Sequence, residues 1–235
     1  MSEKHLSSQF DAELSGISTR VLEMGGLVEA QVSQALYALV HFSGETAGQV
    51  LSLEGRVNTL EVEIDRELSA IIARRQPTAR DLRLLIAVSK TIGNLERVGD
   101  EATRIARVVQ KLLGNGVSSR LMPPATDAQF AATMANAQLR KSLDCFARLD
   151  ADSAVQVIRD DHQLDREFEG QMRKLVTYMM EDPRTITAVI DLVFVAKAIE
   201  RVGDHAKNIA EQVIYIVKGA DVRHTAVSDI EAAVG

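Results

Sequence analysis

Four pairs of acidic residues, each with its members four positions apart, are the groups in this 235-residue chain that could bind metal. Two pairs lie in a five-residue segment, Glu-Arg-Val-Gly-Asp, that occurs at 96–100 and again at 200–204. The other two lie upstream in similar segments, at 61–68 and, 100 positions later, at 161–168. The candidate metal ligands are therefore Glu61, Asp65, Glu96, Asp100, Asp161, Asp165, Glu200 and Asp204.

Residues four positions apart lie on one face of a helix, so each pair would present two carboxylates together. Converging carboxylates repel one another unless they are protonated or bridged by cations. Ligand sets made only of carboxylates favour hard or borderline ions such as Mg, Ca, Mn, Fe or Zn. In a chain with 33 acidic residues such pairs also arise by chance. The metal-site hypothesis therefore depends on their placement at corresponding points of a repeated pattern.

A solvated acidic face is the alternative interpretation, with salt bridges to Arg66, Arg97, Arg166 and Arg201. His162 and His205 adjoin acids in the sequence, but neighbouring helix positions diverge by about 100°. We therefore expect both histidines on the surface. Glycines at 99 and 203, inside predicted helices, indicate the close approach of a neighbouring helix or of an ion cluster.

The helices that must position these pairs are indicated by apolar residues recurring every three or four positions. The repeat extends beyond the five-residue segments, because Ile105 and Val109 match Ile209 and Val213 at the same offset. We expect helices at about 8–42, 45–75, 78–113, 127–149, 152–181 and 183–218. Thr78 is expected to cap the third helix, and Asp182 the sixth, with proline at its first position.

Short breaks between long helices favour antiparallel neighbours. The repeat therefore predicts an all-α fold of two tandem pseudo-symmetric three-helix bundles, with six long antiparallel helices and a separate core in each bundle. The expected units are residues 1–115 and 127–220, with a linker at 116–126 and a tail without pattern at 221–235. Turns near Pro77 and Pro183 would bring the acidic pairs of adjacent helices to comparable heights.

The composition, 46% hydrophobic with only 4% aromatic residues, suits packed helices. With 27 basic and 33 acidic residues, we expect no nucleic-acid partner. Cys145 is the only cysteine, which excludes an intrachain disulfide and favours a reducing compartment. The first residues lack the apolar segment of a secretion signal, and no uncharged apolar run approaches the roughly 18 residues of a membrane span. We expect a cytoplasmic protein.

Four segments resemble the PhoU family, the accessory proteins of the bacterial phosphate-specific transport system. They are VLEMGGLVEAQVSQAL at 21–36, ARRQPTARDLR at 73–83, LERVGDEATRIA at 95–106 and IERVGDHAKNIAE at 199–211. The resemblance covers about residues 6–218. It implies two pseudo-symmetric three-helix bundles and multinuclear metal clusters, of iron or zinc, on the carboxylate faces. Asp161 stands where the first half has Glu61, a shorter ligand that would change the second cluster.

The resemblance also implies a function. Members of this family are negative regulators of the phosphate-starvation response that link the ATPase of the phosphate transporter to a sensor histidine kinase. A homodimer is expected on the same ground. The sequence contains no nucleotide-binding loop, no G-x-S-x-G and no H-E-x-x-H motif, so we expect a regulator and not an enzyme. The alternatives are a helical-bundle metalloenzyme or metal-storage protein that uses the acidic pairs, and a structural adaptor that needs no metal.

Overall fold

The computed structural model describes residues 8–116 and 126–234, and this part of the chain is helical and contains no β-strand. Its long helices are α1 (Ser8–His41), α2 (Gly44–Arg75), α3 (Ala79–Gly114), α4 (Thr126–Arg148), α5 (Ala151–Glu181) and α6 (Ile186–Lys218). A 3-10 turn, η2 (Pro183–Thr185), precedes α6, and a short helix, α7 (Val227–Val234), follows it. The predicted all-α class is confirmed.

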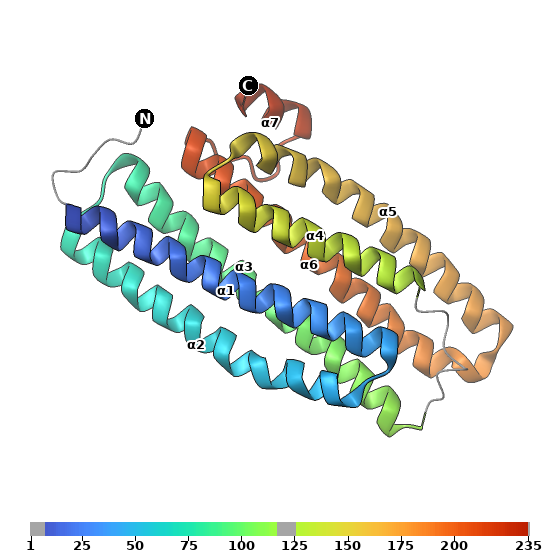
Figure 1. Ribbon diagram of the computed structural model, residues 1–235. Helices are drawn as coiled ribbons and strands as arrows, with labels where there is room; N and C mark the ends of the chain where they lie inside the picture. Colours follow the sequence, from blue (N-terminus) through green and yellow to red (C-terminus); the bar gives the residue numbers. More distant parts are fainter. Residues whose placement is uncertain (1–7, 117–125, 235) are drawn as a thin grey trace.

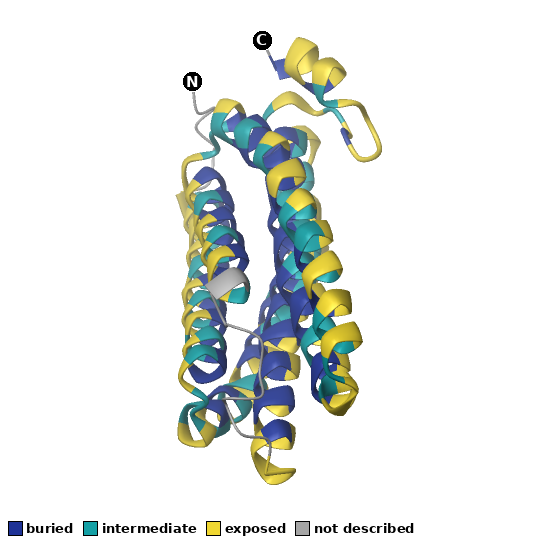
Figure 2. Cartoon of the chain, turned by 90° about the vertical axis from the view of Figure 1, so that its right-hand side faces the viewer, coloured by how far each residue is buried: buried dark blue, intermediate teal, exposed yellow. Residues whose placement is uncertain are grey.

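The helices form two groups of three that lie side by side (Figure 1). Helices α1, α2 and α3 pack together, as do α4, α5 and α6, and the two groups meet along α3 and α6. Helix α1 also contacts α4. Figure 2 shows buried residues on the sides that face neighbouring helices and exposed residues on the outer sides. The acidic residues at 96–100 and 200–204 therefore lie on the two central helices.

The expectation of two separate cores is wrong, because the buried apolar residues of both groups form one cluster. Helix α6 explains the difference. Its residues from Ile209 to Ile214 are all buried, so this stretch contacts neighbours around its whole circumference. One side faces α4 and α5, and another faces α3. The central helices are thus shared between the two groups.

The helix ends follow local sequence signals in most places. The Ser43 and Asp150 side chains accept hydrogen bonds from the first turns of α2 and α5. Asp182 accepts a bond from the Arg184 N–H and so caps the 3-10 turn that begins with Pro183, whereas α6 itself begins three residues later than predicted, with Thr185 at its cap position. Thr78 occupies the cap position of α3, but its side chain makes no capping bond. The prediction of a side-chain cap was therefore wrong, because Thr78 has the extended backbone of a cap residue but its hydroxyl accepts no hydrogen bond from the first turn.

The C-terminal tail contains more structure than the sequence indicated. Helix α7 packs against α5, where Ile230 and Val234 are buried, and Arg159 forms an ion pair with Glu231. Within the described ranges, no helix is long and apolar enough to cross a membrane. The predicted linker lies mostly outside the described residues, so the boundaries between the units stay a prediction.

Candidate metal centre

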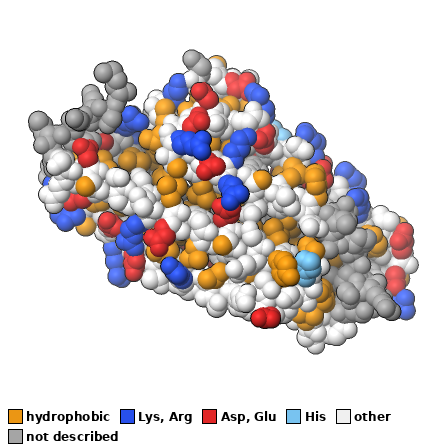
Figure 3. All heavy atoms as spheres, in the orientation of Figure 1, with side chains coloured by type: hydrophobic (Ala, Val, Ile, Leu, Met, Phe, Trp, Pro, Cys, Tyr) orange, Lys and Arg blue, Asp and Glu red, His pale blue; other side chains and the backbone are white. Residues whose placement is uncertain are grey.

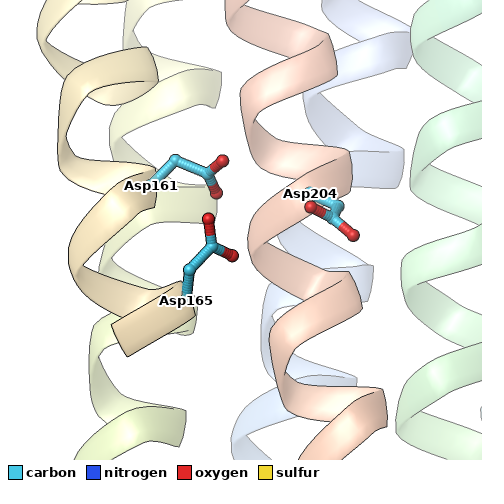
Figure 4. A group of neighbouring side chains, drawn as sticks. All are labelled: Asp161, Asp165 and Asp204. Carbon is cyan, nitrogen blue, oxygen red and sulfur yellow. The ribbon is translucent and has the colours of Figure 1, made fainter. Parts of the chain in front are cut away.

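Three aspartates converge in the second half of the molecule. Asp161 and Asp165 extend from α5 and Asp204 from α6, and Figure 4 shows the first two side chains directed toward α6, where Asp204 lies. One oxygen from each lies within 4.8 Å of the others. Within residues 8–116 and 126–234, this is the one group of three His, Cys, Asp or Glu side chains with such spacing. We call it the second acidic face.

Asp161 is the most fixed member of the second acidic face. Its side chain is buried, and its two carboxylate oxygens accept hydrogen bonds from different helices. Gln138 Nε2 on α4 donates to Oδ1 at 3.2 Å, and Lys207 Nζ on α6 donates to Oδ2 at 3.0 Å. These contacts hold one potential ligand in place before any cation arrives.

Asp204 shows the electrostatic consequence of this crowding. Burial, followed by the nearby Glu200 and Asp161 carboxylates, raises the pKa of its carboxyl from 3.8 to about 6. Charged carboxylates this close repel one another, and a bridging cation would remove the repulsion. The raised pKa therefore describes a site where positive charge is favoured.

Glu200 lies close to these aspartates but is bound elsewhere. Its Oε1 accepts a hydrogen bond from Lys197 Nζ at 2.6 Å, and Lys197 also lies over the Phe168 ring. The second oxygen, Oε2, is buried without a hydrogen-bond partner. Glu200 thus has one lone-pair-bearing oxygen free for a ligand role, although it is outside the group of three.

The first half shows a looser arrangement, which we call the first acidic face. Burial, then Asp65 and Asp100, raise the pKa of Glu61. Burial, then Asp100 and Glu61, raise the pKa of Glu96. These four carboxylates therefore act on one another electrostatically. No three of them, among the residues that the structure places, meet the spacing found in the second half.

The two halves correspond in a register that sequence comparison missed. Gln31 Nε2 on α1 donates to the Val50 carbonyl of α2, and Gln138 Nε2 on α4 donates to the Val157 carbonyl of α5, both at 3.3 Å. The second-half residues lie 107 positions after their counterparts (138 against 31, 157 against 50). Helices α4 and α5 thus follow α1 and α2 by 107 positions.

The glycines of α3 and α6 confirm this register. A Cβ at Gly99 would contact the side chains of Gln31 and Val57, and one at Gly203 would overlap Leu164 and approach Gln138. Leu164 again lies 107 positions after Val57. The expected close approach at these glycines is confirmed, and the groups that approach them are side chains of the neighbouring helices.

Asp161 consequently corresponds to Glu54, and Asp165 to Asn58. The pairing of Glu61 with Asp161, predicted from the offset of 100, is wrong by two helical turns. Sequence similarity there rested on matching charged residues, whereas packing aligns the buried glutamines. Glu54, which the sequence analysis missed, accepts from Arg107 at 3.2 Å and contributes to the raised pKa of Glu96.

The salt-bridge partners also differ from those expected. Arg201 pairs with Glu101 at 3.1 Å, and no ion pair between described residues involves Arg66, Arg97 or Arg166. Lys207 pairs with Asp161 of the second acidic face instead, and Lys197 pairs with the neighbouring Glu200. A solvated face paired with those arginines is therefore not what the fold forms.

His205 is a further correction, because it is buried (6% exposed) and not at the surface. Its Nδ1 lies 3.0 Å from Asn94 Oδ1 on α3. Burial, with Arg201 and Arg97 nearby, lowers its pKa to about 4, so the ring is neutral near pH 7. His205 belongs to the contact between α3 and α6, whereas His162 is exposed as expected.

The family model for the PhoU domain matches residues 21–109 and 131–213. This chain belongs to the PhoU family.

Similarity to PhoU proteins extends over nearly the whole chain. A Burkholderia protein named phosphate-specific transport system accessory protein PhoU homolog is 50% identical over 224 residues, 95% of each chain. The Escherichia coli K12 accessory protein PhoU is 43% identical over 228 residues, 97% of this chain and 93% of that one.

The solved structures agree with the fold. The crystal structure of PhoU from Pseudomonas aeruginosa has a TM-score of 0.85 at 44% identity, covering 90% of this chain and 100% of that one. The regulatory protein PhoU from Streptococcus pneumoniae has a TM-score of 0.83 at 24% identity, covering 91% and 99%, which bears on the fold alone.

The side chains of the second acidic face fit the metal ions that the PhoU resemblance implies. Three carboxylates supply an all-oxygen ligand set, which suits a hard or borderline divalent cation. Such a cation would reduce the repulsion that contributes to the raised pKa of Asp204, and it would give the unpartnered oxygen of Glu200 a partner. The second acidic face could therefore hold a metal.

Proposed function

We propose that this protein is a negative regulator of the phosphate-starvation response, coupling the phosphate-specific ABC transporter to its sensor histidine kinase. The observation that carries the proposal is the near full-length match to proteins named as accessory proteins of phosphate-specific transport. An accessory role in phosphate transport follows from membership of this family. The kinase, the transporter ATPase and a cytoplasmic location are the finer part of the proposal.

The proposed regulator binds metal through its acidic faces. Asp161, Asp165 and Asp204 would hold one cation, with Glu200 joining after release from Lys197. On the first acidic face, Glu61, Asp65, Glu96 and Asp100 would bind a second group of ions, with Glu54 as an added candidate. Iron or zinc are the ions proposed. A bound ion would bridge α5 with α6, or α2 with α3, and fix their spacing.

Docking is the proposed mode of action, and no reaction is assigned. Long helices offer faces for packing against a kinase, an ATPase or a second copy of the chain. The face in Figure 3 carries hydrophobic side chains between interspersed acidic and basic ones. Tyr37 on α1 and Phe130 on α4 are each more than half exposed. Such aromatic side chains are common anchors at protein interfaces.

Gene deletion tests the regulatory role directly. In phosphate-rich medium, a deletion strain should derepress phosphate-starvation genes, read as alkaline phosphatase activity, and the wild-type gene should restore repression. Normal repression in the deletion strain, with no second copy of the gene, would contradict the regulatory role.

Two complementing variants separate metal binding from docking. Asp161→Asn/Asp165→Asn/Asp204→Asn removes the charges of the second acidic face, and Glu169→Gln removes an exposed acid of α5 as the control. If metal orders the docking surface, the triple variant fails to restore repression and the control succeeds. A steady turnover of phosphate esters by the pure protein, lost in the triple variant, would instead favour the metalloenzyme alternative.

A further inference from the structure

A cleft between the two halves of the molecule lies apart from the proposed metal ligands. It has a volume of about 320 Å³ and is lined by residues of α3, of α6 and of the segment that follows α6. Gly93 of α3 leaves part of it open, because a Cβ at this position would meet no atom within 4 Å. The cleft is large enough for a small polar ligand.

Positive charge dominates the lining of this cleft. Lys90 and Arg97 come from α3, and neither forms an ion pair with any described residue. Arg223 comes from the C-terminal segment, where it pairs with Asp221. Glu211 is the single carboxylate in the lining. Because Asp221 already pairs with Arg223, the unpaired cations are Lys90 and Arg97, which outnumber the single carboxylate of the lining. They favour an anionic ligand held by charge-assisted donors.

Two buried acceptors restrict which anion fits. Gln212 is 4% exposed, and its Oε1 has no hydrogen-bond partner. Glu211 is 7% exposed and makes no ion pair within the described part of the chain. The unpartnered Gln212 oxygen destabilises the fold, so a ligand that supplies a donor to it is favoured. Sulfate has no proton to donate near neutral pH, and Glu211 would repel it.

We propose that this cleft binds a protonated tetrahedral oxyanion, a hydrogen phosphate group. The three cationic side chains donate to its oxygens, and Glu211 accepts a hydrogen bond from its hydroxyl. The ligand would connect α3, α6 and the C-terminal segment, and so join the two halves of the protein. This site requires no metal and is independent of the proposed regulatory role.

Isothermal titration calorimetry of the full-length, chelator-treated protein tests the proposal. Inorganic phosphate is titrated slightly above neutral pH, where it keeps one hydroxyl, and glycerol 3-phosphate near pH 6, where about half of the ester keeps its hydroxyl. The two titrations distinguish a free from an esterified phosphate group. At least one of the two phosphates should bind, and sulfate should bind at least roughly tenfold more weakly. Arg97→Gln should weaken phosphate binding by about tenfold or more, through loss of a charge-assisted donor. Glu211→Gln should reduce the preference over sulfate.

Gly93→Leu provides a test that leaves every charge in place. A leucine would fill the open space and abolish binding, and replacing glycine inside a helix favours the helix. Arg173→Gln, an exposed substitution on α5, is the charge-matched control and should bind as the wild type does. The proposal is overturned by absence of binding to both phosphates, by equal binding of sulfate, or by unchanged binding in folded Gly93→Leu.

Discussion

The two acidic faces carry the same five-residue segment and yet differ in how their carboxylates are held. On the second face three aspartates converge, and two lysines bind the carboxylates Asp161 and Glu200. At the positions that correspond to Lys197 and Lys207, 104 residues earlier, α3 has the uncharged residues Gly93 and Thr103. The first face thus has acids that interact at longer range, without lysines between them.

The difference shows that the environment of the repeated segment, and not the segment itself, determines the state of its carboxylates. An ammonium group that pairs with a carboxylate competes with any cation that needs the same oxygen. The second face therefore combines preformed ligand spacing with two competing counter-ions. The first face lacks the preformed spacing, and its counter-ion is Arg107, which pairs with Glu54. We expect the two faces to differ in metal affinity and in stability without metal.

The largest expected effect concerns the two central glycines. In Gly203→Ala the new Cβ overlaps the buried Leu164 side chain, so overpacking should lower the free energy of unfolding by about 1–3 kcal/mol. In Gly99→Ala the nearest atom, Gln31 Oε1, lies 3.1 Å away, and the gain in helix propensity of up to about 1 kcal/mol offsets the contact. Urea unfolding of both variants measures the difference. Equal destabilisation would contradict the asymmetry.

A smaller effect is expected from the competing lysine on α6. Lys207→Met leaves Asp161 buried without its cationic partner, which destabilises the metal-free protein. The same change removes the competitor, so metal should bind the second face roughly tenfold more tightly, a gain of about 1.4 kcal/mol. Calorimetric titration with Zn²⁺ or Mn²⁺ measures the affinity. Lys141→Met, which removes a lysine bound to Asp160 outside the cluster, serves as the control.

The smallest effect concerns pH. The folded-state pKa of Asp204, about 6, exceeds its ordinary value of 3.8, so the folded protein retains a proton that the unfolded chain releases between these values. Its contribution to stability is therefore fully present below about pH 4 and is lost as pH rises through about 6. Urea unfolding of the metal-free protein across this range should show the loss. Asp204→Asn should reduce it more than Glu96→Gln does.

The sequence predicted the helices, and with them the fold, because long amphipathic stretches and short breaks leave few alternatives. The proximity of Asp161, Asp165 and Asp204 required only the assumption that α5 and α6 are antiparallel neighbours. The correspondence of Glu54 with Asp161 was missed, because similar charged residues recur along these helices and align by chance at another offset. Gln31 and Gln138 lie 107 positions apart, which is the correct offset between the two halves. Their equivalence became visible only in the structure, where both glutamines are buried and make the same hydrogen bond.

The burial of His205 had no local signal either. We expected His205 on the surface because it adjoins Asp204 and neighbouring helix positions do not share a face. Helix α6 is covered on more than one side, since α3 packs against the face that carries His205. That contact joins residues more than 100 positions apart, so the amino-acid sequence alone does not reveal it.

Metal content is the most direct test of the difference between the two faces. Elemental analysis would compare natively purified wild type with Asp161→Asn/Asp165→Asn/Asp204→Asn and with Glu54→Gln/Glu61→Gln/Asp100→Asn, each checked for helicity by circular dichroism. The account predicts that the first variant loses the metal bound at the second acidic face while its helicity is retained. An unchanged number of metal ions per chain in that variant would contradict it.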